Sequence, residues 1–330
     1  MNAFQIALLC LLTFTATIPG ASPVHADQAW REYPETLPRF DFSGERLHEH
    51  WPALTAGMRG PFPDEEALLE EAERYPELFE HTEALLRKRA EKDPGFAPFA
   101  EAPLDERVGL YADKVQQAWR LLFEGDFRAA RDLGLSLGPA GYFPGLYAQA
   151  LYAVHLEPEA DRRRELLEEV IANTGELLPH APDHVFLNFG NAYAKSRIME
   201  TQSRTEALRS GYTREVKARL EELLEDDPEN SYAASLLGGI HAGIIDKAGS
   251  FLARTAFGAT ASRMEQYFEQ AMEQAADFPT VHVEYARARR LVYGENDDSA
   301  RELLETAADM EPASAEEALL VDKARRLLEE

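Results

Sequence analysis

Four separated segments of the sequence carry parts of one repeating helical pattern, and this repetition constrains the fold more than any other feature. The segments are Ala118 with Gly125-Asp126-Phe127 and Ala130, Phe186 with Phe189-Gly190 and Tyr193, Leu220 with Leu223, Pro228 and Leu237-Gly238, and Ala300 with Leu304, Ala307 and Pro312. Small residues at helical spacing let two helices approach, and large apolar residues fill the gap to the next pair. The pattern therefore predicts a series of helical hairpins.

The composition favours helices over strands. Val and Ile together supply only 18 of 330 residues, whereas Ala, Leu, Glu and Arg are abundant. A hairpin unit of about 34 residues is the unit of tetratricopeptide repeats. We therefore predict an all-α fold, a tetratricopeptide-like solenoid of helical hairpins wound into a right-handed superhelix.

Residues 1–26 have the features of a secretory signal peptide. An apolar stretch from Ile6 to Ile18 is followed by the small-residue cleavage pattern Val24-His25-Ala26. The stretch is shorter than the roughly 20 residues that a membrane-spanning helix needs. We predict cleavage before Asp27, export, a periplasmic location if the source is bacterial, and no membrane span after cleavage.

The charge and the cysteine content narrow the function classes. The only cysteine, Cys10, lies in the apolar stretch, so the mature chain has no thiol for disulfides or for thiolate metal sites. The net charge is −25. Such a chain repels nucleic acid phosphates and anionic headgroups, so we expect no nucleic acid partner.

Composition shifts divide the mature chain. Residues 27–62 are rich in Pro, Trp and charge, and we expect an irregular lead-in that wraps the helical body. Pro63-Asp64-Glu65-Glu66 is typical of a helix start. It opens an N-terminal helical segment, 63–102, with a second helix from about Leu78 to Ala90. Breaker residues then precede the repeat domain, 103–330.

A G-x-S-x-G pattern at Gly134 to Gly138 raises the possibility of a serine hydrolase with Ser136 as nucleophile. That motif needs a strand before the serine and a helix after it. Residues 127–133 are predicted to be helical, so we favour glycines that loosen a helix end before Pro139. The hydrolase hypothesis is the least favoured of our alternatives, and we predict no catalytic residue.

Histidines offer few candidates for chemistry. His180 and His184, with Asp183 between them, have the residue types of a zinc site. However, Pro179 and Pro182 interrupt the helix that would bring both rings together, and Asp183 is better explained as a helix cap. We assign the remaining candidates, His48, His50, His241 and His282, to the surface or to packing. We find no phosphate loop or dinucleotide fingerprint and predict no metal and no cofactor.

Asn188, Asn191 and Lys195 are the candidate partner-binding residues. Spacings of three and four place them on one face of a helix, opposite a face carrying Phe189 and Tyr193. In a tetratricopeptide solenoid this polar face lines the concave groove, where amide and ammonium donors can hold a peptide backbone or carboxylate. The alternative is an ordinary solvated face.

Three arginines, Arg287, Arg289 and Arg290, form the densest positive cluster. They fit an anion site or, as we favour, pairing with Glu284 and with more distant acids. The acids beyond Glu284 that we considered are Glu302 and Glu305.

From about Val185 onwards the order of features resembles the regulator of microtubule dynamics family, a divergent tetratricopeptide group. The matching segments are Gly190-Asn191-Ala192-Tyr193-Ala194-Lys195, Leu223 to Asn230, Leu237-Gly238-Gly239-Ile240-His241, Phe251 to Gly258 and Tyr267-Phe268-Glu269-Gln270-Ala271. The resemblance implies a helical-repeat fold, no enzymatic activity and no cofactor.

Two noncatalytic functions stand beside the hydrolase alternative. The first is an exported helical-repeat protein that binds a protein or peptide in a concave groove. The second is the soluble accessory subunit of a periplasmic uptake system, which holds a small ligand or a binding protein. The sequence names no partner.

Overall fold

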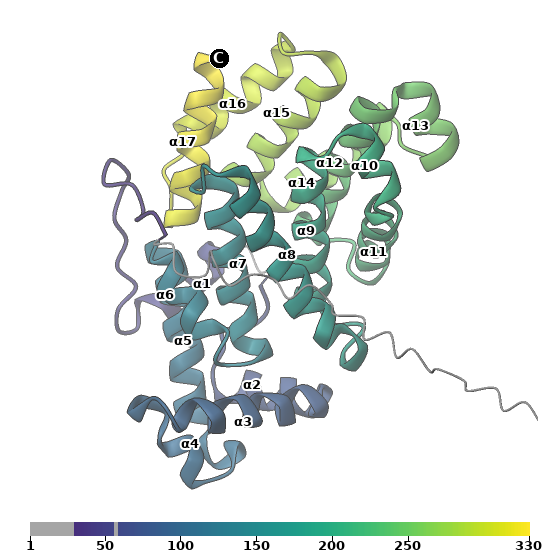
Figure 1. Ribbon diagram of the computed structural model, residues 1–330. Helices are drawn as coiled ribbons and strands as arrows, with labels where there is room; N and C mark the ends of the chain where they lie inside the picture. Colours follow the sequence, from purple (N-terminus) through teal and green to yellow (C-terminus); the bar gives the residue numbers. More distant parts are fainter. Residues whose placement is uncertain (1–29, 56–58) are drawn as a thin grey trace, which may run out of the picture. The chain divides into compact units, whose positions relative to one another are not determined.

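A computed structural model describes residues 30–55 and 59–330, and this part of the chain is all-helical, with 17 α-helices, three short 3-10 helices and no strand (Figure 1). The all-α prediction is confirmed. The chain divides into a unit of residues 1–30 and a compact unit of residues 31–330, and every described helix belongs to the second. The predicted signal peptide, 1–26, lies outside the described residues.

The N-terminal helices are α1 (Arg46–Thr55), α2 (Glu65–Arg74), α3 (Pro76–Ala90), α4 (Pro98–Glu101), α5 (Val108–Glu124), α6 (Phe127–Gly134), α7 (Pro139–His155) and α8 (Ala160–Leu177). The C-terminal helices are α9 (Val185–Thr201), α10 (Arg204–Arg209), α11 (Tyr212–Asp226), α12 (Ser231–Ala248), α13 (Ser250–Phe257), α14 (Ala261–Ala275), α15 (Pro279–Tyr293), α16 (Asp298–Asp309) and α17 (Ala315–Glu329).

Local signals determine several of these boundaries. The predicted helix start at 63–66 is present as α2, which begins at Glu65, and the Asp64 carboxylate caps it by accepting a hydrogen bond from the Ala67 amide at 3.0 Å. Gly125 ends α5 with φ of 91°, and Asp126 caps α6. Glycine adopts such a backbone more readily than other residues, which explains why Gly125 stands at the turn between these two helices.

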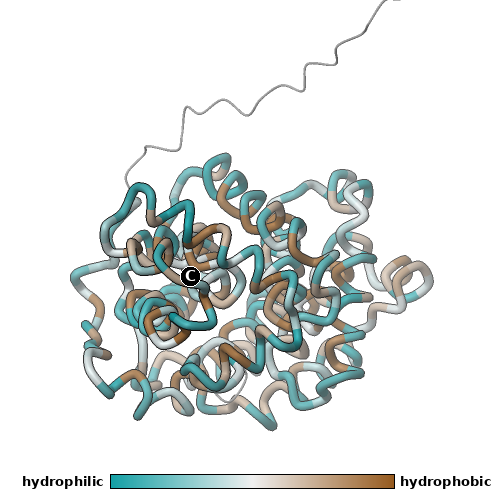
Figure 2. Tube along the Cα trace, turned by 90° about the horizontal axis from the view of Figure 1, so that it is seen from below, coloured by the Kyte–Doolittle hydropathy of each residue, from teal (hydrophilic) through white to brown (hydrophobic). Residues whose placement is uncertain are grey.

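From α5 to α9, from α10 to α13 and from α14 to α17, successive helices pack against one another along the chain. Within the described residues, α5, α7, α9, α12, α15 and α17 also contact each other in that order, and α17 contacts α5. These helices therefore form a closed ring of contacts, which we call the inner ring. Apolar and polar stretches alternate along the helices in Figure 2, as expected when one side of each is buried.

Close helix crossings depend on two glycines. A Cβ atom at Gly134 of α6 would lie 2.4 Å from the Gly141 carbonyl oxygen of α7, and one at Gly238 of α12 would lie 2.7 Å from the Phe268 ring of α14. A larger residue does not fit at either position. Gly134 is thus explained by packing.

The lead-in differs from the prediction, because it contains α1 within the segment 27–62 that we expected to be irregular. The Trp51 ring of α1 packs edge-on against Trp119 of α5, with ring centroids 4.9 Å apart. The Phe42 amide donates to the Glu124 carboxylate at 2.7 Å. These contacts with α5 give the segment the burial that orders α1, which local sequence signals do not reveal.

Candidate functional site

The predicted groove residues are buried, so their assignment to an open polar face is wrong. Asn188, Asn191 and Lys195 are 2%, 6% and 7% exposed. The Asn191 amide donates to the Thr174 hydroxyl of α8 at 2.9 Å, and Lys195 forms an ion pair with Glu215 of α11. Asn188 donates to the Pro182 carbonyl oxygen at 2.7 Å. These side chains hold α9 against its neighbours in the chain.

The opposite face of α9 lines the main cavity of the described chain. Phe189 and Tyr193, on the face that we predicted to lie opposite the groove, are part of the cavity wall. The two faces of α9 thus have roles opposite to those predicted, because the polar side chains find partners on α8 and α11 that the sequence of α9 alone does not show.

The cavity has a volume of about 110 Å³, and most of its wall comes from α7, α9, α12, α15 and α17 of the inner ring, with Ala207 of α10, Thr213 of α11 and Phe257 of α13 completing it. An engineered apolar cavity of about 150 Å³ is enough to bind benzene. Apolar and aromatic side chains make most of the wall, including Tyr147, Leu151, Phe189, Tyr193, Tyr232, Ile240 and Ile244. The cavity here is smaller but open to solvent, so it holds a compact organic group and lets a longer one extend out of it.

Two glycines of α12 form part of this wall. Gly239 and Gly243 line the cavity, and a Cβ atom at either position would meet no heavy atom within 4 Å. They therefore differ from the neighbouring Gly238, which the Phe268 ring requires. A glycine inside a helix costs about 0.5–1 kcal/mol relative to Ala. At Gly239 and Gly243 the missing side chain does not bring another helix closer, but it keeps the cavity wide.

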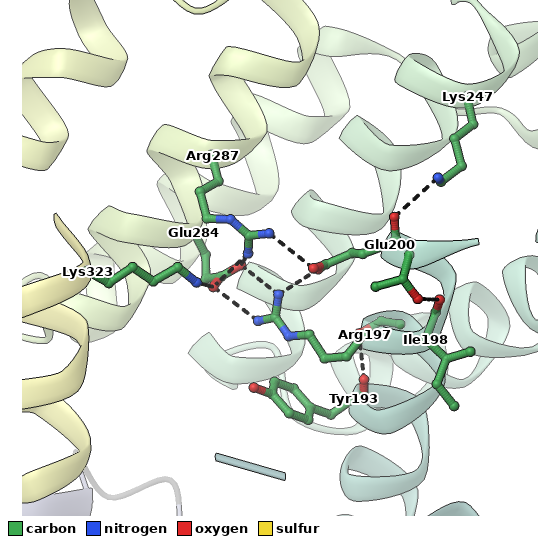
Figure 3. A network of polar contacts seen from close by, with 10 residues as sticks. Tyr193, Arg197, Ile198, Glu200, Lys247, Glu284, Arg287 and Lys323 are labelled. Atoms are coloured by element: carbon green, nitrogen blue, oxygen red, sulfur yellow. Dashed lines mark hydrogen bonds and ion pairs between the residues drawn. The ribbon is translucent and has the colours of Figure 1, made fainter. Parts of the chain in front are cut away.

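Charged side chains from α9, α15 and α17 form a network (Figure 3), and three of them, Arg197, Glu200 and Glu284, line the cavity. Arg197 of α9 pairs with Glu200 at 2.6 Å and with Glu284 of α15 at 3.1 Å. Arg287 pairs with the same carboxylates, at 3.0 Å to Glu200 and 2.9 Å to Glu284. Lys323 of α17 lies 3.9 Å from Glu284. We call these five residues the Arg197 cluster.

The cluster keeps its carboxyl groups ionised despite burial. Burial raises the pKa of the Glu284 carboxyl, but Arg197, Arg287 and Lys323 together hold it well below its usual value. Burial, reinforced by Arg287, lowers the pKa of the Lys323 ammonium to about 7. His155 of α7 lines the cavity beside the cluster, and burial and these cations hold its pKa well below normal, so it is neutral.

Arg59, from the lead-in, is the second buried charge inside the inner ring. Its side chain is 2% exposed and pairs at 2.7 Å with Glu316 of α17, whose side chain is 4% exposed. Five aromatic rings lie within 6.0 Å of the guanidinium carbon; they are Trp119, Phe123, Phe143, Tyr147 and Tyr232. Arg59 therefore joins the lead-in to α5, α7, α12 and α17.

Tyr147 and Tyr232 contact Arg59 and also line the cavity. Next to the ion pair, burial raises the pKa of the Glu317 carboxyl to about 7, and Glu316 adds to this effect. The Glu317 carboxylate accepts from the Ala313 amide at 2.8 Å.

The Ser136 pattern does not form a nucleophile site. As predicted, helix α6 precedes it, and its hydroxyl donates to the Leu133 carbonyl oxygen at 2.6 Å. Gly138 has φ of 69°, and a Cβ atom there would lie 2.3 Å from the Thr82 hydroxyl. Both glycines of the pattern thus have structural explanations.

His180 and His184 contact different acidic residues and do not share a site. The Nδ1 atom of His180 contacts Glu77, and the Nε2 atom of His184 lies 3.2 Å from Glu71. His184, not Asp183, caps α9, because Asp183 pairs with Arg74 at 2.9 Å. Among the described residues no group of three or more His, Cys, Asp or Glu is placed to hold a metal ion.

The C-terminal arginines follow the predicted pairing in part. Arg287 pairs with Glu284 as expected. Arg289 instead pairs with Asp297 at 2.6 Å, and Arg290 donates to the Leu327 carbonyl oxygen at 2.9 Å. The expected acids Glu302 and Glu305 take no part in these contacts; Glu305 pairs with Arg301.

Sequence reasoning missed the cavity, Arg59 and the Arg197 cluster. A usable signal was the pair Gly239 and Gly243, one turn apart within an apolar helix. No described helix is both long and apolar enough to cross a membrane. Comparison with models of known protein families and with curated proteins finds no match to this chain.

Proposed function

We propose that this protein is a noncatalytic binding protein that holds a small ligand in the cavity of its inner ring. The observation that carries the proposal is the cavity itself, with about 110 Å³ of space, mostly apolar walls and polar groups gathered on one side. Small-molecule sites typically combine these features. This function corresponds to the hypothesis of an exported, soluble accessory subunit of a periplasmic uptake system.

In this proposal the helices form a tetratricopeptide-like solenoid with a right-handed superhelix. The inner-ring helices are the first helices of successive hairpins, and the cavity is on the concave side. The contacts between helices that follow one another along the chain support this arrangement.

A peptide-binding groove is the weaker alternative. The residues that favoured it, Asn188, Asn191 and Lys195, are buried and have partners inside the chain. The small-ligand function does not depend on them.

The proposal is tested by filling the cavity with larger side chains. Gly239→Leu and Gly243→Leu each place a side chain in open space. Protein from the native host is unfolded, and its released small molecules are identified by mass spectrometry. We expect a molecule that co-purifies with the wild type and is lost from the double variant.

The matched control is Gly175→Leu, the same change at an exposed position of α8 outside the cavity wall. It keeps the ligand if the cavity is the site. Equal recovery from the wild type and the filled double variant would refute the proposed function.

A further inference from the structure

Four cations lie near the two carboxylates on the charged side of the cavity. Arg197, Arg287 and Lys323 contact the carboxylates of Glu200 and Glu284, and of these residues Arg197, Glu200 and Glu284 line the cavity. Lys247 of α12 also lines the cavity, and its ammonium lies against the backbone of Glu200 (Figure 3). In a chain with a net charge of −25, this local surplus of positive charge is a specific feature of the site.

The two carboxylates are fully used by their neighbours. Glu284 pairs with Arg197, Arg287 and Lys323, and Glu200 pairs with both arginines. Lys247 therefore has no carboxylate partner among these contacts. Its ammonium donates to the backbone carbonyl oxygens of Glu200 at 3.4 Å and Gln202 at 2.8 Å.

Donors on this side are left for an anion. An ammonium has three N–H groups, and Lys247 uses two of them. Arg197 lines the cavity and is 7% exposed, and its Nε atom has no hydrogen-bond partner among the described residues. A buried donor without a partner is costly, and a bound acceptor removes that cost.

The rest of the wall fits a hydrocarbon. Gly239 and Gly243 expose a bare strip of α12 backbone, and Phe189, Ile240 and Ile244 line the same space. A hydrocarbon chain against this strip is stabilised by the burial of its apolar surface.

We infer that the ligand is an apolar monocarboxylate, whose carboxylate lies against Lys247 and whose hydrocarbon part lies along Gly243 and Gly239, one and two turns earlier on the same face of α12. This inference rests on the small-ligand function proposed above and names the chemical class of the ligand. A charge-assisted hydrogen bond to the carboxylate sets its orientation in the cavity.

The test compares three probes of equal chain length by isothermal titration calorimetry with the full mature chain. The probes are octanoate, 1-octanol and octylammonium. We expect octanoate to bind at least about tenfold more tightly than 1-octanol, and octylammonium to bind least, because only the carboxylate matches the positive surplus.

Two substitutions locate the carboxylate. Lys247→Met keeps an apolar stem of similar length and is expected to weaken octanoate binding about tenfold, with 1-octanol unchanged. Lys114→Met, on α5 outside the cavity wall, is the matched control and leaves both affinities unchanged. Circular dichroism verifies that each variant is folded.

The outcomes separate the inference from the proposed function. Equal binding of octanoate and 1-octanol, or no effect of Lys247→Met, overturns the carboxylate class while ligand binding stands. If no probe binds, the inference is also overturned, and the extraction experiment with the filled cavity then decides the proposed function.

Discussion

Two buried arginines lie inside the inner ring, and they differ in how their charge is neutralised. Arg59 faces one carboxylate, Glu316, within a shell of five aromatic rings. Arg197 shares two carboxylates with Arg287, close to Lys323 and beside an open cavity. The Arg59 pair has equal opposite charges, whereas the Arg197 cluster has an excess of cations.

This difference separates two uses of a buried charge. A buried pair of equal charges joins parts of the fold and leaves little charge for a ligand. A cluster with surplus cations beside a cavity attracts an anion. Tyr147 and Tyr232 lie between the two, since they contact Arg59 and line the cavity.

The strongest test of this comparison removes each arginine in turn. We expect Arg59→Met to lower the free energy of unfolding by about 3–5 kcal/mol, because Glu316 is left as an unpaired buried charge. Arg197→Met leaves Arg287 and Lys323 beside the carboxylates, so its loss is smaller, about 1–3 kcal/mol. Urea unfolding measures both.

A double variant, Arg59→Met with Glu316→Leu, provides the control, because it removes both charges together. It should recover much of the stability lost in Arg59→Met. Equal losses for the two single variants would contradict the distinction.

The Arg59 region also predicts a pH dependence. The pKa of Glu317 is raised to about 7 from a usual 4.5, so its protonated form stabilises the fold. That stabilisation is complete below pH 4.5 and is lost as the pH rises to 7. Glu317→Gln mimics the protonated group, so its stability relative to the wild type should rise over this window.

The expected gain of Glu317→Gln above pH 7 is on the order of 3 kcal/mol, from about 1.4 kcal/mol per unit of pKa. Melting temperatures of the variant and the wild type, measured from pH 5 to pH 8, test this gain. A difference between variant and wild type that stays constant with pH would show that Glu317 does not titrate in this window.

Adjacent glycines of α12 sharpen the comparison at the cavity. Gly238→Ala should destabilise the fold by about 1–3 kcal/mol, because its Cβ atom would lie 2.7 Å from the Phe268 ring. Gly239→Ala should stabilise it by about 0.5–1 kcal/mol, because Ala favours the helix more than Gly does and its Cβ atom meets no neighbour within 4 Å. Thermal unfolding compares them, and effects of the same sign would count against an open cavity wall.

The smallest expected effect is the pH dependence of octanoate binding. With its pKa near 7, Lys323 gains charge as the pH falls from 8 to 6, facing Arg197, Glu200, Glu284 and Arg287. Octanoate should therefore bind several-fold more tightly at pH 6 than at pH 8. Binding of 1-octanol should not change, and tighter octanoate binding at pH 8 would contradict the assignment of Lys323 to the positive surplus.

Features determined by nearby residues were predictable from the sequence. The Asp64 cap, the Gly125-Asp126 turn and α16, with Ala300, Leu304 and Ala307 fully buried, all follow from caps or helical spacing. Such features depend on contacts within one or two helical turns, which the sequence displays directly.

Features that depend on distant partners were not predictable. Polar residues occur on both sides of α9, and only the positions of Thr174 and Glu215 decide that Asn191 and Lys195 face inward. Arg59 follows a stretch with no strong pattern and meets a carboxylate on the last helix. Neither pairing leaves a local signal.

The pairing of Arg59 with Glu316 spans 257 positions of the chain. A biosynthetic consequence follows, because a polypeptide emerging from the ribosome can build most of its helical hairpins before Glu316 exists. Until then Arg59 has no carboxylate to pair with, and the five aromatic rings lack the ion pair around which they pack. Helix α17, which is synthesised after the other helices of the inner ring, thus completes the surroundings of Arg59, and a chain truncated before Ala315 would lack them.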